Sequence, residues 1–103
     1  MARYDVFANP SSSAADGIPY VVEIQSGLID ALATRLTIPL ALPAVAKVPT
    51  ALCPVITVKG QRMHALAHYC APLPAKLLRR PIDNVAAQGG ALVSAMDAVL
   101  SGF

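Results

Sequence analysis

Short runs of alternating apolar and polar residues dominate the first two-thirds of the chain. Residues 3–8 and 18–25 alternate in this way on either side of a polar loop, which predicts an antiparallel hairpin with a long tip. The clearest alternation lies at residues 35–40. Pro39 cannot donate a hydrogen bond to a neighbouring strand, so we expect this strand to end there or to lie beside an edge or a bulge.

Two further apolar runs, at 54–59 and 61–67, are separated by Lys59-Gly60. A glycine at such a position favours a tight turn, so these runs predict a second hairpin. A last short extended piece is expected at residues 74–78, just before the C-terminal element.

The C-terminal element has the pattern of a helix. Asp83 or Asn84 can cap its first turn, because a short side-chain oxygen accepts hydrogen bonds from the unpaired N–H groups there. Gly89-Gly90 weakens the predicted helix, since each glycine costs about 1 kcal/mol relative to alanine. Gly102 is expected to end it. The apolar residues that form one stripe at spacings of three, four and seven are Val85, Leu92, Met96, Val99 and Phe103.

Strands followed by one helix, without alternation of the two, predict an α+β fold that is mainly β. We expect a small barrel or curled antiparallel sheet with a C-terminal α-helix. A length of 103 residues fits a single domain over residues 1–103. The chain is 55% hydrophobic and only 14% charged, so some apolar surface should remain for a partner or a second copy to cover.

The net charge of +2 is too small to indicate nucleic-acid binding. The one dense basic spot, Lys76 with Arg79 and Arg80, is interpreted as a solvated patch beside a turn. The N-terminus lacks the apolar region of a signal peptide, and residues 36–46 are too short and proline-rich to span a membrane. We therefore expect a cytoplasmic protein.

Candidate chemistry is sparse. Cys53 and Cys70 are interpreted as reduced thiols, with a disulfide as the alternative. Even with His64 and His68 their spacing matches no zinc site, so no metal is expected. Arg35, Arg62 and His64 could serve RNA cleavage, with a base and cations around a strained phosphate, but spacing places no acidic or hydroxyl partner beside them.

Phosphate loops, dinucleotide fingerprints and carboxylate pairs do not occur in the sequence. No cofactor is expected, and binding to a protein is favoured over catalysis.

Several segments carry a resemblance to a known family. The pattern V-x-x-Q-S-x-x-I-D at residues 22–30 is followed by R-x-x-I-P-L at 35–40. Pro54-Val55, Arg62-Met63 and the closing Gly102-Phe103 continue the match. Over nearly its whole length, the chain resembles the CcdB family, the toxins of bacterial type II toxin–antitoxin pairs.

The resemblance implies a small SH3-like barrel with a C-terminal helix and a homodimer. It also implies a function: members bind the A subunit of DNA gyrase and trap the cleaved-DNA complex, and they are not enzymes. A cognate antitoxin, whose disordered tail folds on the toxin, neutralises them. Because the family shares its fold with MazF-like endoribonuclease toxins, RNA cleavage is the alternative.

The same resemblance implies the gyrase-binding residues. They are an apolar pair, which matches Leu28 and Ile29, and the last three residues, which match Ser101, Gly102 and Phe103. The family has Trp where this chain has Ser101, and a Trp ring is a typical interface anchor. Three explanations are open: Phe103 supplies the aromatic group, the target differs, or the toxin is weakened or inactive.

Overall fold

The computed structural model describes residues 3–25, 32–45 and 52–101, and in this part of the chain strands are followed by a single α-helix. The helix is α1 (Gly89–Ser101). The strands are β1 (Asp5–Ala8), β2 (Tyr20–Glu23), β3 (Thr34–Ala41), β4 (Val55–Val58), β5 (Gln61–Ala65), β6 (Ala71–Pro74) and β7 (Asp83–Asn84). Short 3₁₀ turns are η1 (Ser12–Asp16), η3 (Ala67–Tyr69), η4 (Ala75–Leu77) and η5 (Ala86–Gln88).

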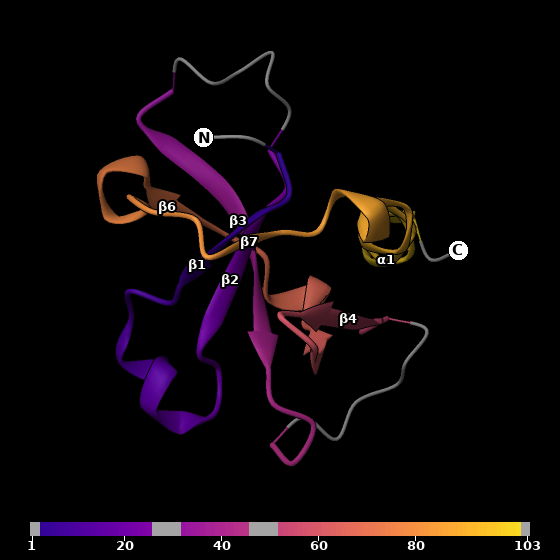
Figure 1. The fold of residues 1–103 in the computed structure, drawn as a ribbon. Helices are drawn as coiled ribbons and strands as arrows, with labels where there is room; N and C mark the ends of the chain where they lie inside the picture. The colour runs from indigo at the N-terminus through magenta and orange to yellow at the C-terminus, as the bar shows by residue number, and fades with distance from the viewer. Residues whose placement is uncertain (1–2, 26–31, 46–51, 102–103) are drawn as a thin grey trace.

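These strands form one antiparallel sheet in the order β4-β5-β3-β2-β1-β7, and β6 pairs with β3 beside β5. The sheet curls into a nearly closed barrel, with α1 along one side (Figure 1). This arrangement confirms the predicted fold class: α+β, mainly β, with a barrel-like sheet and a C-terminal helix. Within the described ranges, no helix is long and apolar enough to cross a membrane.

Strand β3 lies at the centre of the sheet because three strands pair with it. On one side, residues 37–40 pair with β2. On the other side, residues 34–37 pair with β6, and residues 40–41 pair with β5. Pro39 falls between these two partners, where a missing N–H breaks no ladder bond, and its carbonyl accepts from the N–H of Leu66 at 2.9 Å. The strand therefore continues through the proline instead of ending there.

The extended piece predicted at residues 74–78 is wrong in position. Residues 71–74 form strand β6, and residues 75–77 turn away from it. Two prolines in four residues hide this strand in the sequence. They are tolerated because Pro72 and Pro74 alternate with Ala71 and Leu73. The N–H groups of Ala71 and Leu73 face β3, which leaves the proline nitrogens on the free edge of the sheet.

The two predicted hairpins are both confirmed. Strands β1 and β2 pair across a loop that contains η1, whose cap is the Ser11 hydroxyl accepting from the Ser13 N–H at 3.2 Å. Strands β4 and β5 meet at Lys59 and Gly60, with φ of 49° and 80°. Positive φ at both positions is the conformation of the two-residue turn whose twist matches that of paired strands.

One apolar core fills the barrel and holds α1 against it. Its members come from β1 to β5 and from α1, and Val6, Ile38, Ile56, Met63 and Leu92 are completely buried. Burying a side chain of this size stabilises the fold by about 1.5–3 kcal/mol relative to leaving it exposed. The helix is therefore part of the core and not an appendage to the sheet.

Side chains close the seam between the two ends of the sheet, where β4 and β7 are the outermost strands. The Gln88 amide donates to the Thr57 carbonyl at 2.9 Å and accepts from the Thr57 N–H at 2.8 Å. The Asp83 carboxylate accepts from the Lys59 N–H at 2.9 Å. These bonds satisfy main-chain groups at the edge of β4 that a neighbouring strand would otherwise pair with.

The start of the helix differs from the prediction. Asp83 and Asn84 do not cap it; they form β7, which pairs with Asp5 and Val6 of β1. The Asn84 amide also donates to the Arg3 carbonyl and to the Asp5 carboxylate. Its side-chain oxygen accepts from the Ala86 N–H at 3.0 Å, so it bonds to the 3₁₀ turn η5 that precedes α1 and not to α1 itself. The α-helix begins only at Gly89.

The buried stripe of α1 also differs from the prediction. Val85 is buried but precedes the helix, while Leu92 is buried and Met96 is half-buried, as expected. Ala95 completes the buried face, and Val99 is 36% exposed instead of packed. The stripe is short because the core that it covers ends near Ala95.

Gly89 allows α1 to lie against the N-terminal strand. A Cβ atom at this position would meet the Tyr4 ring at 2.7 Å, closer than such contacts occur, whereas a Cβ at Gly90 would meet nothing within 4 Å. Tyr4 itself adopts φ of 70°, and its carbonyl accepts from the Val85 N–H at 2.9 Å, so it has little freedom to move away.

We predict opposite effects of the same substitution at these two glycines. Gly89→Ala should lower the free energy of unfolding by about 1–3 kcal/mol through overpacking against Tyr4. Gly90→Ala should raise it by up to about 1 kcal/mol, because alanine favours a helix and nothing obstructs it. Urea denaturation followed by circular dichroism measures both, and equal effects would contradict the close approach.

Candidate functional site

The C-terminal end of α1 carries the one predicted site residue that lies in the described part of the chain. Ser101 is the last residue of α1, and its side chain is exposed. Leu28, Ile29, Gly102 and Phe103 lie outside the described residues. The structure thus defines the helix that leads to the predicted binding tip, and the candidate site is built from that helix and its surroundings.

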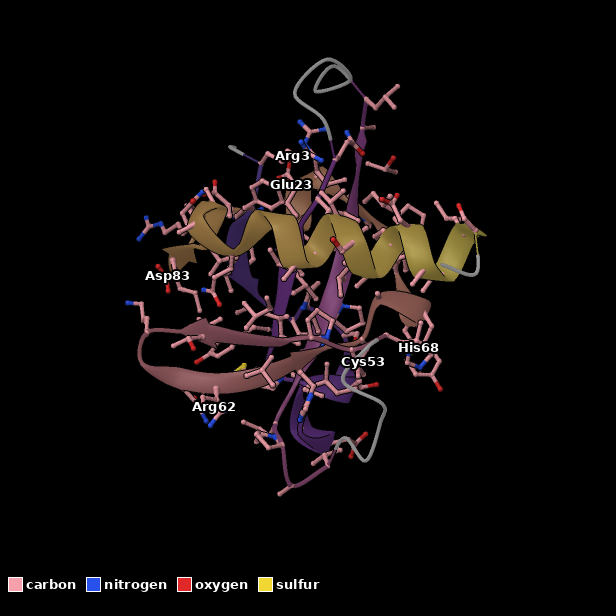
Figure 2. The ribbon with its side chains drawn as sticks, turned by 90° about the vertical axis from the view of Figure 1, so that its right-hand side faces the viewer. Arg3, Glu23, Cys53, Arg62, His68 and Asp83 are labelled. Carbon is pink, nitrogen blue, oxygen red and sulfur yellow. The ribbon has the colours of Figure 1, made fainter. Side chains whose placement is uncertain are left out.

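Packing fixes the direction of α1. Leu92 and Ala95 enter the barrel core, Met96 is half-buried beside them, and the helix contacts η3. Figure 2 shows α1 crossing the whole face of the barrel, with its C-terminal end at the border of the molecule. A helix anchored by its middle presents its last turn rigidly to a partner.

The last turn of α1 is apolar as well as exposed. Leu100 is 76% exposed, and Val99 beside it is 36% exposed. Val93, which precedes Leu100 by seven residues and so shares its face, is 40% exposed. Exposed apolar side chains that gather on one element are typical of a contact surface.

Leu100 is a candidate site residue that the sequence analysis missed. It falls outside the apolar stripe that points into the core, and nothing in the sequence alone separates it from other leucines. Its phase places it on the same face as Val93 and Asp97, away from the core, but only the structure shows that this face is exposed there.

A shallow hollow lies alongside α1 and leads away from this end. Its volume is about 180 Å³, and its lining residues are Arg3, Ile24, Leu92, Val93, Met96 and Asp97. Ile24 lies just ahead of residues 26–31, the segment that carries the other two predicted site residues. The side of α1 that bears Val93 therefore shares this hollow with Ile24.

Buried polar groups form hydrogen bonds with the described residues that flank positions 26–31 in the sequence. Before these positions, the side-chain carbonyl of Gln25 accepts from the Leu36 N–H at 3.0 Å. After them, the Arg35 guanidinium donates to the Leu32 carbonyl at 2.6 Å. Because Gln25 and Arg35 are both buried, these bonds form in a setting where water competes poorly, and they hold Leu32 and Leu36 in place.

The residues considered for RNA cleavage are not brought together. Arg35 lies 3.9 Å from the completely buried Glu23 carboxylate and is itself only 8% exposed. His64 pairs with Ala41 at the other end of β3, six residues from Arg35, which corresponds to about 20 Å along the strand. Arg62 lies beside His64 on β5, and Figure 2 shows it far from Glu23. Arg35 is thus a structural residue.

Cys53 and His68 contact one another without forming a metal centre. The Cys53 Sγ lies 3.5 Å from His68 Nδ1, and the Cys53 carbonyl lies 3.2 Å from His64 Nδ1. Burial raises the pKa of the Cys53 thiol, and a hydrogen bond with the Ala67 backbone opposes this only in part. Both cysteines are free thiols, and no group of three or more metal-binding side chains occurs among the described residues.

The buried position of Arg35 leads to a stability prediction. Arg35→Ala should lower the free energy of unfolding by about 3 kcal/mol, because it leaves the Glu23 carboxylate buried without its cation. Arg62→Ala is the matched control, and this exposed arginine should change stability by less than about 0.5 kcal/mol. Urea denaturation of both variants tests this, and equal stabilities would show that Arg35 is dispensable to the fold.

Comparison with known proteins adds one finding. No curated protein matches the chain. The family model described as "CcdB protein" matches residues 3–102, which is almost the entire sequence and includes every structural element described above.

Proposed function

Because this chain belongs to the CcdB family of toxins, we propose that it acts by binding the A subunit of DNA gyrase and trapping the cleaved-DNA complex. The observation that best supports a binding role is the exposed apolar end of α1, with Leu100 at 76% exposure. A helix fixed in the core and ending in uncovered apolar side chains is suited to insertion into a partner.

The serine at position 101 requires a different anchor from the family tryptophan. Ser101 is exposed and too small to fill a pocket in a partner. We propose that Leu100 and Phe103 together supply the apolar contact, with Leu28 and Ile29 as a second contact.

The remaining parts of the proposal follow from the family. A homodimer would cover part of the apolar surface that the low charge content leaves exposed. A cognate antitoxin would neutralise the toxin, and the site of action would be the cytoplasm. Binding would require no reaction, so the proposal needs no catalytic residue or cofactor. The separation of Arg35 from His64 disfavours the ribonuclease alternative.

The proposal is tested by expressing the gene under an inducible promoter. Double-strand DNA breaks with an SOS response, together with retention of the gyrase A subunit on the immobilised protein, are the expected results. Rapid loss of messenger RNA without DNA damage would overturn the proposal in favour of RNA cleavage. Growth unaffected by overexpression would show that the chain is not an active toxin.

Variants at the end of α1 locate the binding site. Leu100→Ser and deletion of residues 101–103 should each weaken binding to the gyrase A subunit about thirtyfold and abolish toxicity, as expected for loss of an interface anchor worth about 2 kcal/mol. Surface plasmon resonance measures the affinity. Leu77→Ser is the matched control, because Leu77 is also exposed (50%) but lies in η4.

Circular dichroism and gel filtration of the same variants separate binding from folding. A deletion that unfolds the protein would show that the tail is structural. Full toxicity of a folded Leu100→Ser variant would contradict the proposed position of the site.

A further inference from the structure

The segment that follows β6 presents the densest positive charge of the chain. Lys76 lies in η4, and Arg79 and Arg80 follow within four residues; all three side chains are exposed. In the parts of the chain that the structure describes, no carboxylate forms an ion pair with any of them. The Arg79 Nε atom donates to the Lys76 carbonyl at 3.2 Å, which ties the cations into one turn.

This segment is held firmly on the barrel. Leu78 is only 2% exposed and packs with Phe7 and Val21 in a small apolar cluster on the outer face of β1 and β2. Beyond the arginines, the Ile82 N–H donates to the Val6 carbonyl at 2.8 Å. With the chain anchored on both sides of the arginines, their side chains are presented at a fixed place.

Two hollows flank η4, and each joins an apolar floor to a basic rim. The first, of about 450 Å³, is lined by Phe7, Ala8, Leu77, Arg79 and Arg80. The second, of about 520 Å³, is lined by Ala33, Thr34, Pro74, Ala75 and Lys76. The 3₁₀ turn η4 contributes to both hollows: Leu77, which is 50% exposed, lines the first, and Ala75 and Lys76 line the second.

We propose that this basic groove, formed by the two hollows around η4, binds an acidic peptide segment of a protein partner. Its carboxylates would accept hydrogen bonds from Arg79 and Arg80, and its apolar side chains would enter the hollows against Leu77. Charge complementarity selects this occupant, because the described residues that line the groove offer cations and apolar surface and include no carboxylate. The inference goes beyond the proposed function, since β6 and the segment after it lie on the side of the sheet away from α1 (Figure 1).

A peptide fits the basic groove better than a nucleic acid does. Three cations can neutralise only a few phosphates, and nucleic-acid binding sites add aromatic rings on which bases stack. The aromatic residue in the groove is Phe7, whose ring is 2% exposed and therefore unable to stack on a base.

Fluorescence polarisation with a labelled peptide of three Glu-Glu-Asp-Leu repeats tests the inference on the full chain. The double variant Arg79→Glu/Arg80→Glu should bind this peptide roughly tenfold more weakly, since each exposed ion pair contributes up to about 1 kcal/mol. Leu77→Ser should weaken binding about threefold without changing its dependence on salt, because it removes apolar contact and leaves the charges.

Control measurements distinguish binding of the peptide in the basic groove from its general attraction to exposed cations. Arg62→Glu, which reverses an exposed charge on β5, should bind the peptide as the unaltered chain does. Three results would each overturn the inference. They are an equal loss of peptide affinity for Arg62→Glu, an unchanged affinity for the Arg79/Arg80 double variant, and tighter binding of single-stranded DNA of equal charge. Leu100→Ser should retain peptide binding, so failure of the gyrase proposal and failure of this one give different results.

Discussion

The fold depends on β3 pairing with three other strands. Pro39 lies between the residues of β3 that pair with β6 and those that pair with β5; it cannot donate, and its carbonyl accepts from the Leu66 N–H. On the opposite side the same strand pairs with β2 without interruption. Any residue with an N–H at this position would place a donor between these two partners, so the proline suits the change of partner that lets the sheet curl into a barrel.

Much of the β structure could be predicted, because each strand carries its own alternation and each hairpin its own turn residues. The Lys59-Gly60 turn is an example: its geometry is local, so the sequence indicates it directly. Strand β6 could not be found in this way. Its two prolines oppose strand formation locally, and only the pairing with β3 makes them acceptable.

The predicted start of the helix was wrong for a related reason. Asp83 and Asn84 are good capping residues, but Asp83 also accepts from the distant Lys59 N–H, and the Asn84 amide donates to the distant Arg3 carbonyl. The Asn84 oxygen accepts from the Ala86 N–H in η5, ahead of α1. Gly89 was interpreted as a weak point within the helix, whereas it is the first residue and lies against the Tyr4 ring. Local propensity could not anticipate either contact.

The candidate site shows the same division between local and tertiary information. The family resemblance identified the end of the chain, and the match over residues 3–102 confirms the family. The exposure of Leu100 and the structural role of Arg35 could not be predicted, because both depend on how far the core extends around them. An arginine buried beside Glu23 and one on the surface have the same appearance in a sequence.

The prolines of β6 have a consequence for how this protein meets others. Strand edges are the usual route by which β-rich proteins aggregate, since free N–H groups recruit a further strand. On β6 the outward positions are Pro72 and Pro74, which offer no such group, and the edge of β4 is occupied by Gln88 and Asp83. Addition of a further strand is therefore disfavoured along β6 and at the Thr57 end of the β4 edge. Contacts at these strands are thus left to side-chain recognition and not to pairing of main chains.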